Sequence, residues 1–209
     1  MTLIRRATQA ALAAATALAL AGCVTVFPKT KPSQLYRFGD APPPAEASAA
    51  GLSVGVARAP TSFARAVSGD RILTLTGAEA AYIGQARWVS PASVLFDEAV
   101  ARAFDANPGA ARLVARGGVA QAPYRLALDV RDFQVVYDSG RTPTVVVRVR
   151  AVLTRVEDRT VAGDELFAAE VKARRNRVGD IVEAFDAANG QTIGKIVAWT
   201  NARVAPPAG

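Results

Sequence analysis

Residues 144–153 read TVVVRVRAVL, a run in which apolar and polar side chains alternate. Its apolar side chains share one face of an extended chain: Val145, Val147, Val149, Ala151 and Leu153. Two arginines, Arg148 and Arg150, fall on the opposite face. A period of two residues is typical of a β-strand with one face in a core and one face in water, most often in antiparallel pairing. The run therefore predicts a half-buried sheet.

Two flanking segments alternate in the same way, YRLALDV at residues 124–130 and LFAAEVKA at residues 166–173. The side chains expected to face inward are Tyr124, Leu126, Leu128, Val130, Phe167, Ala169, Val171 and Ala173. Turn-like sequences separate the three segments, DSGRTP at 138–143 and EDR at 157–159. Shorter strands are predicted at residues 52–57, 71–76, 80–86 and near 111–116.

Two stretches have the spacing of helices. Ser90 is expected to cap the first, with Pro91 at its first helical position and an end at residues 107–109. Its inward side chains are Leu95, Phe96, Ala99, Val100, Ala103 and Phe104. The second helix runs from about 180 to 202, and Gly190 inside it costs about 1 kcal/mol relative to alanine, which suggests a kink or a close packing contact. Its inward side chains are Val182, Phe185, Thr192, Ile193, Ile196, Val197 and Thr200.

This order of elements predicts an α/β (α+β) fold. We expect a single mostly antiparallel or mixed sheet of about six to seven strands, with the two main helices packed on one face.

The composition excludes several kinds of chemistry. The chain of 209 residues has no histidine, and its only cysteine is Cys23. A Ser-His-Asp triad, a Cys-His pair and a His-ligated metal are therefore excluded, as are an internal disulfide and a Cys-rich zinc site. The net charge of +7 favours anionic surfaces but is too small and dispersed to indicate nucleic-acid binding. The sequence predicts neither a cofactor nor a bound metal.

The N-terminus has the organisation of an export signal. Arg5 and Arg6 precede a short apolar stretch, residues 10–21, that is too short for a stable membrane span. Leu20-Ala21-Gly22-Cys23 looks like a bacterial lipobox, in which the cysteine sulfur is lipidated and cleavage leaves Cys23 as the first mature residue. The alternatives are a soluble secretory signal with an incidental cysteine, and twin-arginine export through the Arg5-Arg6 pair, whose surroundings do not otherwise resemble that signal.

The residues after Cys23 indicate a tether. Position 24 is Val24 rather than aspartate, which by the sorting rule of enterobacteria-like lipoproteins favours the outer membrane over the inner. Residues 24–50 are rich in proline, alanine and serine, as in a semi-flexible spacer. One apolar patch, Leu35 to Phe38, interrupts the spacer and is expected to dock on the domain as a short strand.

For several other motifs, a purely structural interpretation stands beside a functional one. Gly51-Leu52-Ser53-Val54-Gly55 matches the G-x-S-x-G nucleophile elbow, but it follows a proline-rich linker, has a strand pattern through it and lacks a histidine partner, so a first strand is the better interpretation. Tyr82 and Trp88 are expected in or near the core. Asp164 and Glu165 should point to opposite faces of a strand, which makes them a poor acid–base pair.

The basic run KARRNR, residues 172–177, has two interpretations. Its cations, Lys172, Arg174, Arg175 and Arg177, are candidates for contact with lipid headgroups or an acidic partner. The alternative is a solvated strand end.

Residues 69–104 resemble the ABC-type transport auxiliary lipoproteins, the group of the paraquat-inducible C lipoprotein. The pattern is a strand beginning near Arg71-Ile72, then Tyr82, then Ala86-Arg87-Trp88, and then Pro91 before an amphipathic helix. Tyr36 after the lipobox and Trp199 in the last helix also fit. The resemblance spans nearly the whole mature chain. It implies a non-enzymatic envelope protein that works with an inner-membrane permease, an ATPase and an MCE-type protein to move phospholipids or other hydrophobic molecules.

From these features we expect a signal peptide at residues 1–22, a lipidated N-terminus and linker at 23–50, the α/β domain at 51–204 and a short tail at 205–209. The protein is expected at the periplasmic face of the outer membrane, with the inner membrane as the alternative. Its expected partners are the transporter proteins and the membrane, with a homo-oligomer as a further option. The rival hypothesis is an assembly or scaffold lipoprotein of another envelope complex. A third hypothesis, an envelope hydrolase, is supported only by the G-x-S-x-G motif that contains Ser53.

Overall fold

A computed structural model describes residues 32–39, 53–107, 109–114, 122–138 and 142–204. The chain divides into two compact units, Met1–Pro32 and Ser33–Gly209, and every helix and strand described below belongs to the second. Among the described residues, no helix is long and apolar enough to cross a membrane. The predicted signal peptide, Cys23, linker residues 40–50, Gly51 and Leu52, and the tail at 205–209 lie outside the described residues.

Three long strands form the main part of the sheet, as the alternating segments predicted. They are β7 (Tyr124–Val136), β8 (Thr144–Arg155) and β9 (Val161–Lys172), paired antiparallel in sequence order. The inward side chains of β8 are fully buried, including Val145, Val147 and Val149 at 0% exposure. The predicted faces of these strands are confirmed.

Short strands extend the sheet from the other edge of β7. They are β1 (Gln34–Tyr36), β2 (Val54–Arg58), β3 (Ser62–Phe63), β4 (Arg71–Thr76), β5 (Glu79–Trp88) and β6 (Ala111–Val114). β2, β3 and β4 pair with β7 in parallel and in that order along it, because a strand of 13 residues is long enough to accommodate three short ones end to end. β5 pairs with β4, β1 with β5, and β6 with β2. Within the part of the chain that the structure describes, the mixed sheet thus has nine strands rather than six to seven.

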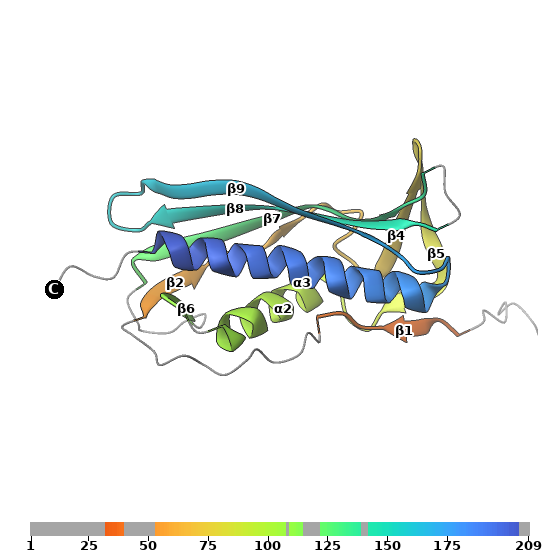
Figure 1. Ribbon diagram of the computed structural model, residues 1–209, viewed down its shortest axis with the longest axis horizontal. Helices are drawn as coiled ribbons and strands as arrows, with labels where there is room; N and C mark the ends of the chain where they lie inside the picture. Colours follow the sequence, from red (N-terminus) through yellow and green to blue (C-terminus); the bar gives the residue numbers. More distant parts are fainter. Residues whose placement is uncertain (1–31, 40–52, 108, 115–121, 139–141, 205–209) are drawn as a thin grey trace, which may run out of the picture. The chain divides into compact units, whose positions relative to one another are not determined.

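Both helices, α2 (Ala92–Ala106) and α3 (Val178–Arg203), lie on the same side of the sheet, as predicted (Figure 1). The predicted start of α2 was one residue too early, because Pro91, not Ser90, is the N-cap residue and no side chain caps the helix. Its first N–H groups, those of Ala92 and Ser93, instead donate to the carbonyl oxygens of Gly69 and Ser68. Backbone carbonyl groups of a neighbouring loop therefore accept the hydrogen bonds that a capping side chain would otherwise accept.

An aromatic cluster fills the core where α3 crosses the sheet. Phe38, Trp88, Phe133 and Phe185 are each at most 2% exposed. Ring centroids lie 4.9 Å apart for Phe38 and Trp88, 5.2 Å for Phe38 and Phe133, and 5.2 Å for Trp88 and Phe185. The Phe38–Trp88 and Trp88–Phe185 contacts are edge-to-face and the Phe38–Phe133 contact is tilted, and such aromatic pairs add to the burial energy of the rings. The cluster joins the segment after β1 to both the sheet and α3.

Two glycines give opposite predictions. A methyl group added at Gly190 meets nothing within 4 Å, so the expected packing contact at this position is absent and Gly190→Ala should raise the free energy of unfolding by about 0.5–1 kcal/mol. A methyl group at Gly163 would lie 2.7 Å from Cζ2 of Trp199, so Gly163→Ala should lower it by about 1–3 kcal/mol. Urea titration of the two variants measures both. Equal effects of the same sign would contradict the packing described.

Candidate functional site

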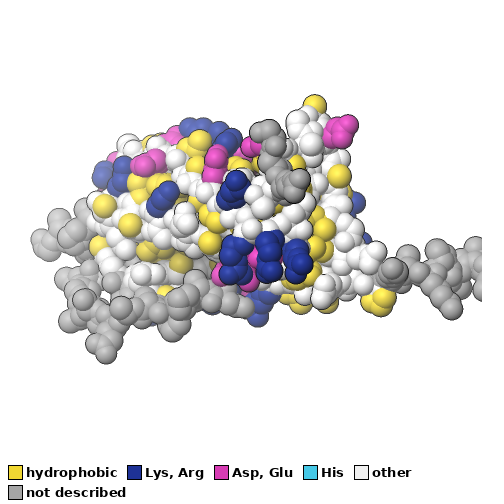
Figure 2. Space-filling view, turned by 45° about the vertical axis from the view of Figure 1, so that its right-hand side comes forward, with side chains coloured by type: hydrophobic (Ala, Val, Ile, Leu, Met, Phe, Trp, Pro, Cys, Tyr) yellow, Lys and Arg dark blue, Asp and Glu magenta, His cyan; other side chains and the backbone are white. Residues whose placement is uncertain are grey.

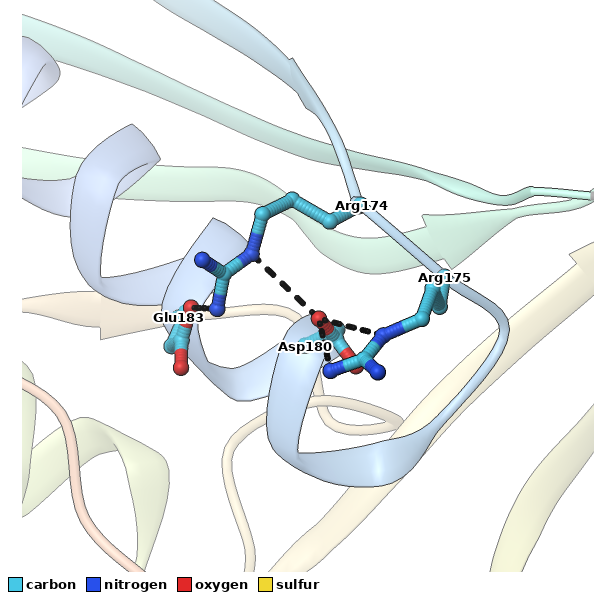
Figure 3. Close-up of polar contacts among 4 residues, drawn as sticks. All are labelled: Arg174, Arg175, Asp180 and Glu183. Atoms are coloured by element: carbon cyan, nitrogen blue, oxygen red, sulfur yellow. Dashed lines mark hydrogen bonds and ion pairs between the residues drawn. The ribbon is translucent and has the colours of Figure 1, made fainter.

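The basic segment, residues 172–177, connects the end of β9 to the start of α3. Figure 2 turns this end of the folded unit forward and shows Lys and Arg side chains gathered around acidic ones. Arg174 and Arg175 both bind Asp180 in the first turn of α3, with Nε–Oδ distances of 3.3 and 3.1 Å (Figure 3). Arg174 also pairs with Glu183. A carboxylate in the first turn is favoured by the helix dipole, so these contacts also stabilise the beginning of α3.

The four cations of the basic segment divide into two pairs. The side chain of Asp180 is only 4% exposed, whereas those of Arg174 and Arg175 are 69% and 62% exposed and lie over it. Lys172 and Arg177 are exposed and form no ion pair with any described residue. Asp180 and Glu183 were missed by the sequence reasoning, although acidic residues in the first turns of a helix that follows a basic run are a recognisable signal. The charge available to a partner is therefore that of Lys172 and Arg177.

A second candidate feature is the junction at Gly39, where the chain after β1 contacts both helices. The backbone N–H of Gly39 donates to Oδ1 of Asp186 in α3 at 2.6 Å, and its carbonyl oxygen accepts from Arg102 of α2 at 3.0 Å. Gly39 has φ +87°, and a Cβ there would lie 2.8 Å from that of Ala99. Only glycine fits both the backbone conformation and the space. The expected docking of residues 35–38 as a short strand is confirmed in part, because β1 spans Gln34–Tyr36 and ends before Arg37 and Phe38. The junction at Gly39 had no signal beyond the lone glycine.

The other sequence candidates have structural positions. Ser53 is exposed and directly precedes β2, so the strand interpretation of its motif is confirmed. Trp88 is buried and Tyr82 is half-buried beneath the guanidinium of Arg71. Asp164 pairs with Arg150 and Glu165 with Arg203, on opposite faces of β9 as predicted. Among the described residues, no group of three or more His, Cys, Asp or Glu side chains is placed to hold a metal ion.

The outer face of the sheet carries paired charges. Arg150 of β8 donates to both carboxylate oxygens of Asp164 in β9, through Nε at 2.7 Å to Oδ1. This hydrogen bonding lowers the pKa of Asp164 and raises that of Arg150. In the β8–β9 turn, the side-chain hydroxyl and backbone N–H of Thr160 lower the pKa of Asp158. All three groups are exposed, so each pair contributes little by itself.

These shifts predict how stability depends on pH. A carboxyl whose pKa is lowered by folding stabilises the fold above its unfolded pKa, and the contribution is lost as the pH falls through its folded pKa. Because the chain has no histidine, the melting temperature should stay constant between about pH 6 and pH 8 and fall below about pH 4. Calorimetry across this range measures it. A difference of several degrees between the melting temperatures at pH 6 and pH 8 would contradict the prediction.

The family model of the ABC-type transport auxiliary lipoprotein component matches residues 36–197, from β1 to the last turns of α3. The chain belongs to this family. The resemblance carried by residues 69–104 is thereby confirmed. Among curated proteins, none matches this ABC-type transport auxiliary lipoprotein significantly.

Three solved structures share the fold of this auxiliary lipoprotein. A protein from Xanthomonas campestris is 24% identical, covers 82% of this chain and 94% of its own, and has a TM-score of 0.66. An uncharacterised protein is 11% identical, with coverages of 81% and 99% and a TM-score of 0.63. A hypothetical protein from Chlamydia trachomatis is 10% identical, with coverages of 73% and 98% and a TM-score of 0.51.

Proposed function

We propose that this auxiliary lipoprotein is anchored through Cys23 to the periplasmic face of the outer membrane. There it serves an ABC/MCE-type transporter that moves phospholipids or other hydrophobic molecules between the inner and outer membranes. The observation that carries the proposal is the family match from residue 36 to residue 197, together with a lipobox in the sequence before it. Its partners are the MCE-type protein, the permease and the ATPase.

The proposed role is binding rather than catalysis. The chain has no histidine to act as a base, and Ser53, the serine of the nucleophile-like motif, directly precedes strand β2. Loss of a measurable esterase activity in a Ser53→Ala variant would overturn this part of the proposal.

Complementation tests the transport role. A strain that lacks the protein should transfer pulse-labelled phospholipid between its membranes more slowly, and the full chain should restore the rate. Unchanged transfer, together with a defect in another envelope process, would instead favour the scaffold lipoprotein. Neighbouring reading frames discriminate at once, because genes for a permease, an ATPase and an MCE protein beside this one support the transporter.

A further inference from the structure

The membrane tether ends at β1, well before the first long strand. Gln34 and Tyr36 pair in parallel with Ala86 and Trp88 of β5, and Phe38 is 1% exposed in the aromatic cluster. Hydrogen bonds from α2 and to α3 then hold Gly39. Pulling on the chain before residue 34 therefore acts on the packed core.

This docking limits how far the domain can move from a lipid on Cys23. Eleven residue steps separate Cys23 from Gln34, and an extended chain spans at most 3.3–3.6 Å per residue, so the reach is roughly 40 Å. If the chain were free up to Ser53, the reach would be roughly 100 Å. The 26 residues of α3 span about 39 Å. The tether is thus no longer than the domain itself.

The short tether and the exposed cations Lys172 and Arg177 both belong to the end of the folded unit where β1 and α3 begin. We infer that the end of the folded unit where β1 and α3 begin faces the membrane that holds the lipid anchor, with Lys172 and Arg177 on its anionic lipid headgroups. This inference rests on the proposed lipidation of Cys23. In Figure 1 the beginnings of β1 and α3 lie at the same end of the unit, opposite the β8–β9 turn.

Charge complementarity supports headgroups as the occupant. Lys172 and Arg177 are exposed and form no ion pair with the part of the chain that the structure describes, whereas Asp180 and Glu183 compensate the two arginines between them. A cation at an anionic membrane surface contributes enough to change a docked-to-undocked ratio roughly fivefold, so two change it roughly 25-fold. Lys172, Arg177 and the tether therefore act at the same end of the folded unit.

Distances from the membrane test the orientation. In the lipidated protein the sulfur of Cys23 is bonded to lipid, so an introduced cysteine is the only free thiol. Gly179 in the first turn of α3 has open space for a side chain, and Glu157 in the β8–β9 turn is exposed. Gly179→Cys and Glu157→Cys proteins carry a fluorophore and are reconstituted into vesicles of phosphatidylethanolamine and phosphatidylglycerol with a headgroup acceptor. Energy transfer should be several-fold more efficient from position 179.

A charge variant tests the headgroup contact. Lys172→Gln/Arg177→Gln should lower the docked-to-undocked ratio roughly 25-fold, and replacing phosphatidylglycerol with phosphatidylcholine should do the same to the unsubstituted protein. The matched control is Arg112→Gln/Arg125→Gln, which removes two exposed cations, one in β6 and one near the start of β7, at the end of the sheet away from Lys172. This control should leave the ratio unchanged.

The outcomes separate the inference from the function on which it rests. A lipidated protein with equal transfer from both positions, or more from position 157, would overturn the orientation alone. Equal effects of the two charge variants would overturn the headgroup contact. Absence of acyl chains on Cys23 by mass spectrometry would overturn the inference and the proposed anchoring together.

Discussion

A Phe38→Ala variant should lose roughly 3 to 4 kcal/mol of the free energy of unfolding. Phe38 is 1% exposed and contacts Trp88 and Phe133 at ring-centroid distances of 4.9 and 5.2 Å. Its truncation leaves a cavity at the centre of the aromatic cluster and removes two ring contacts. Chemical denaturation of the folded domain measures the loss.

Leu35→Ala is the matched control. Leu35 belongs to the same docked segment but is 60% exposed, so its truncation should change the free energy of unfolding by less than about 0.5 kcal/mol. If both variants had the stability of the unsubstituted protein, the segment around β1 would not be part of the packed core.

Replacing Cys23 with serine should move the protein from the membrane fraction to the soluble fraction. Acyl chains stabilise anchoring by about 0.8 kcal/mol per buried methylene, and two or more chains hold a protein in the membrane effectively permanently. A serine at this position cannot form the thioether that the proposed lipidation requires. Fractionation of cells after metabolic palmitate labelling measures both the location and the modification.

Val24→Asp is the companion variant. It keeps Cys23 and should keep the palmitate label, while an aspartate after this cysteine should move the protein from its proposed place in the outer membrane to the inner membrane. A Cys23→Ser protein that stays with the membranes after an alkaline wash would show that something other than the lipid anchors it.

The long strands and both helices could be predicted because their signals are local. A run such as residues 144–153 has only one way to bury five apolar side chains, and all five are at 0% exposure. The family pattern proves to be structural in the same way. In the Ala86-Arg87-Trp88 segment, the side chains of Ala86 and Trp88 are buried. The side chain of Arg87 lies on the exposed face, where its Nη1 is 2.9 Å from Oδ2 of Asp70.

The parts that the sequence did not reveal depend on contacts between distant segments. β3 has two residues, too few for an alternating pattern, and its place beside β7 is set by tertiary packing. Gly39 meets Asp186 across 147 positions of the chain, so no local spacing indicates the contact. Arg174 and Arg175 were predicted as candidate contacts for headgroups or an acidic partner, but the acidic residue that neutralises them belongs to the next helix.

Affinity purification of the lipidated protein from membranes, in mild detergent, tests the transport role most directly. The proteins recovered should include an MCE-type protein, with the permease and the ATPase of the same transporter, and the Cys23→Ser protein should recover far less of them. Recovery of only cell-wall or secretion proteins with the unsubstituted chain would contradict the account.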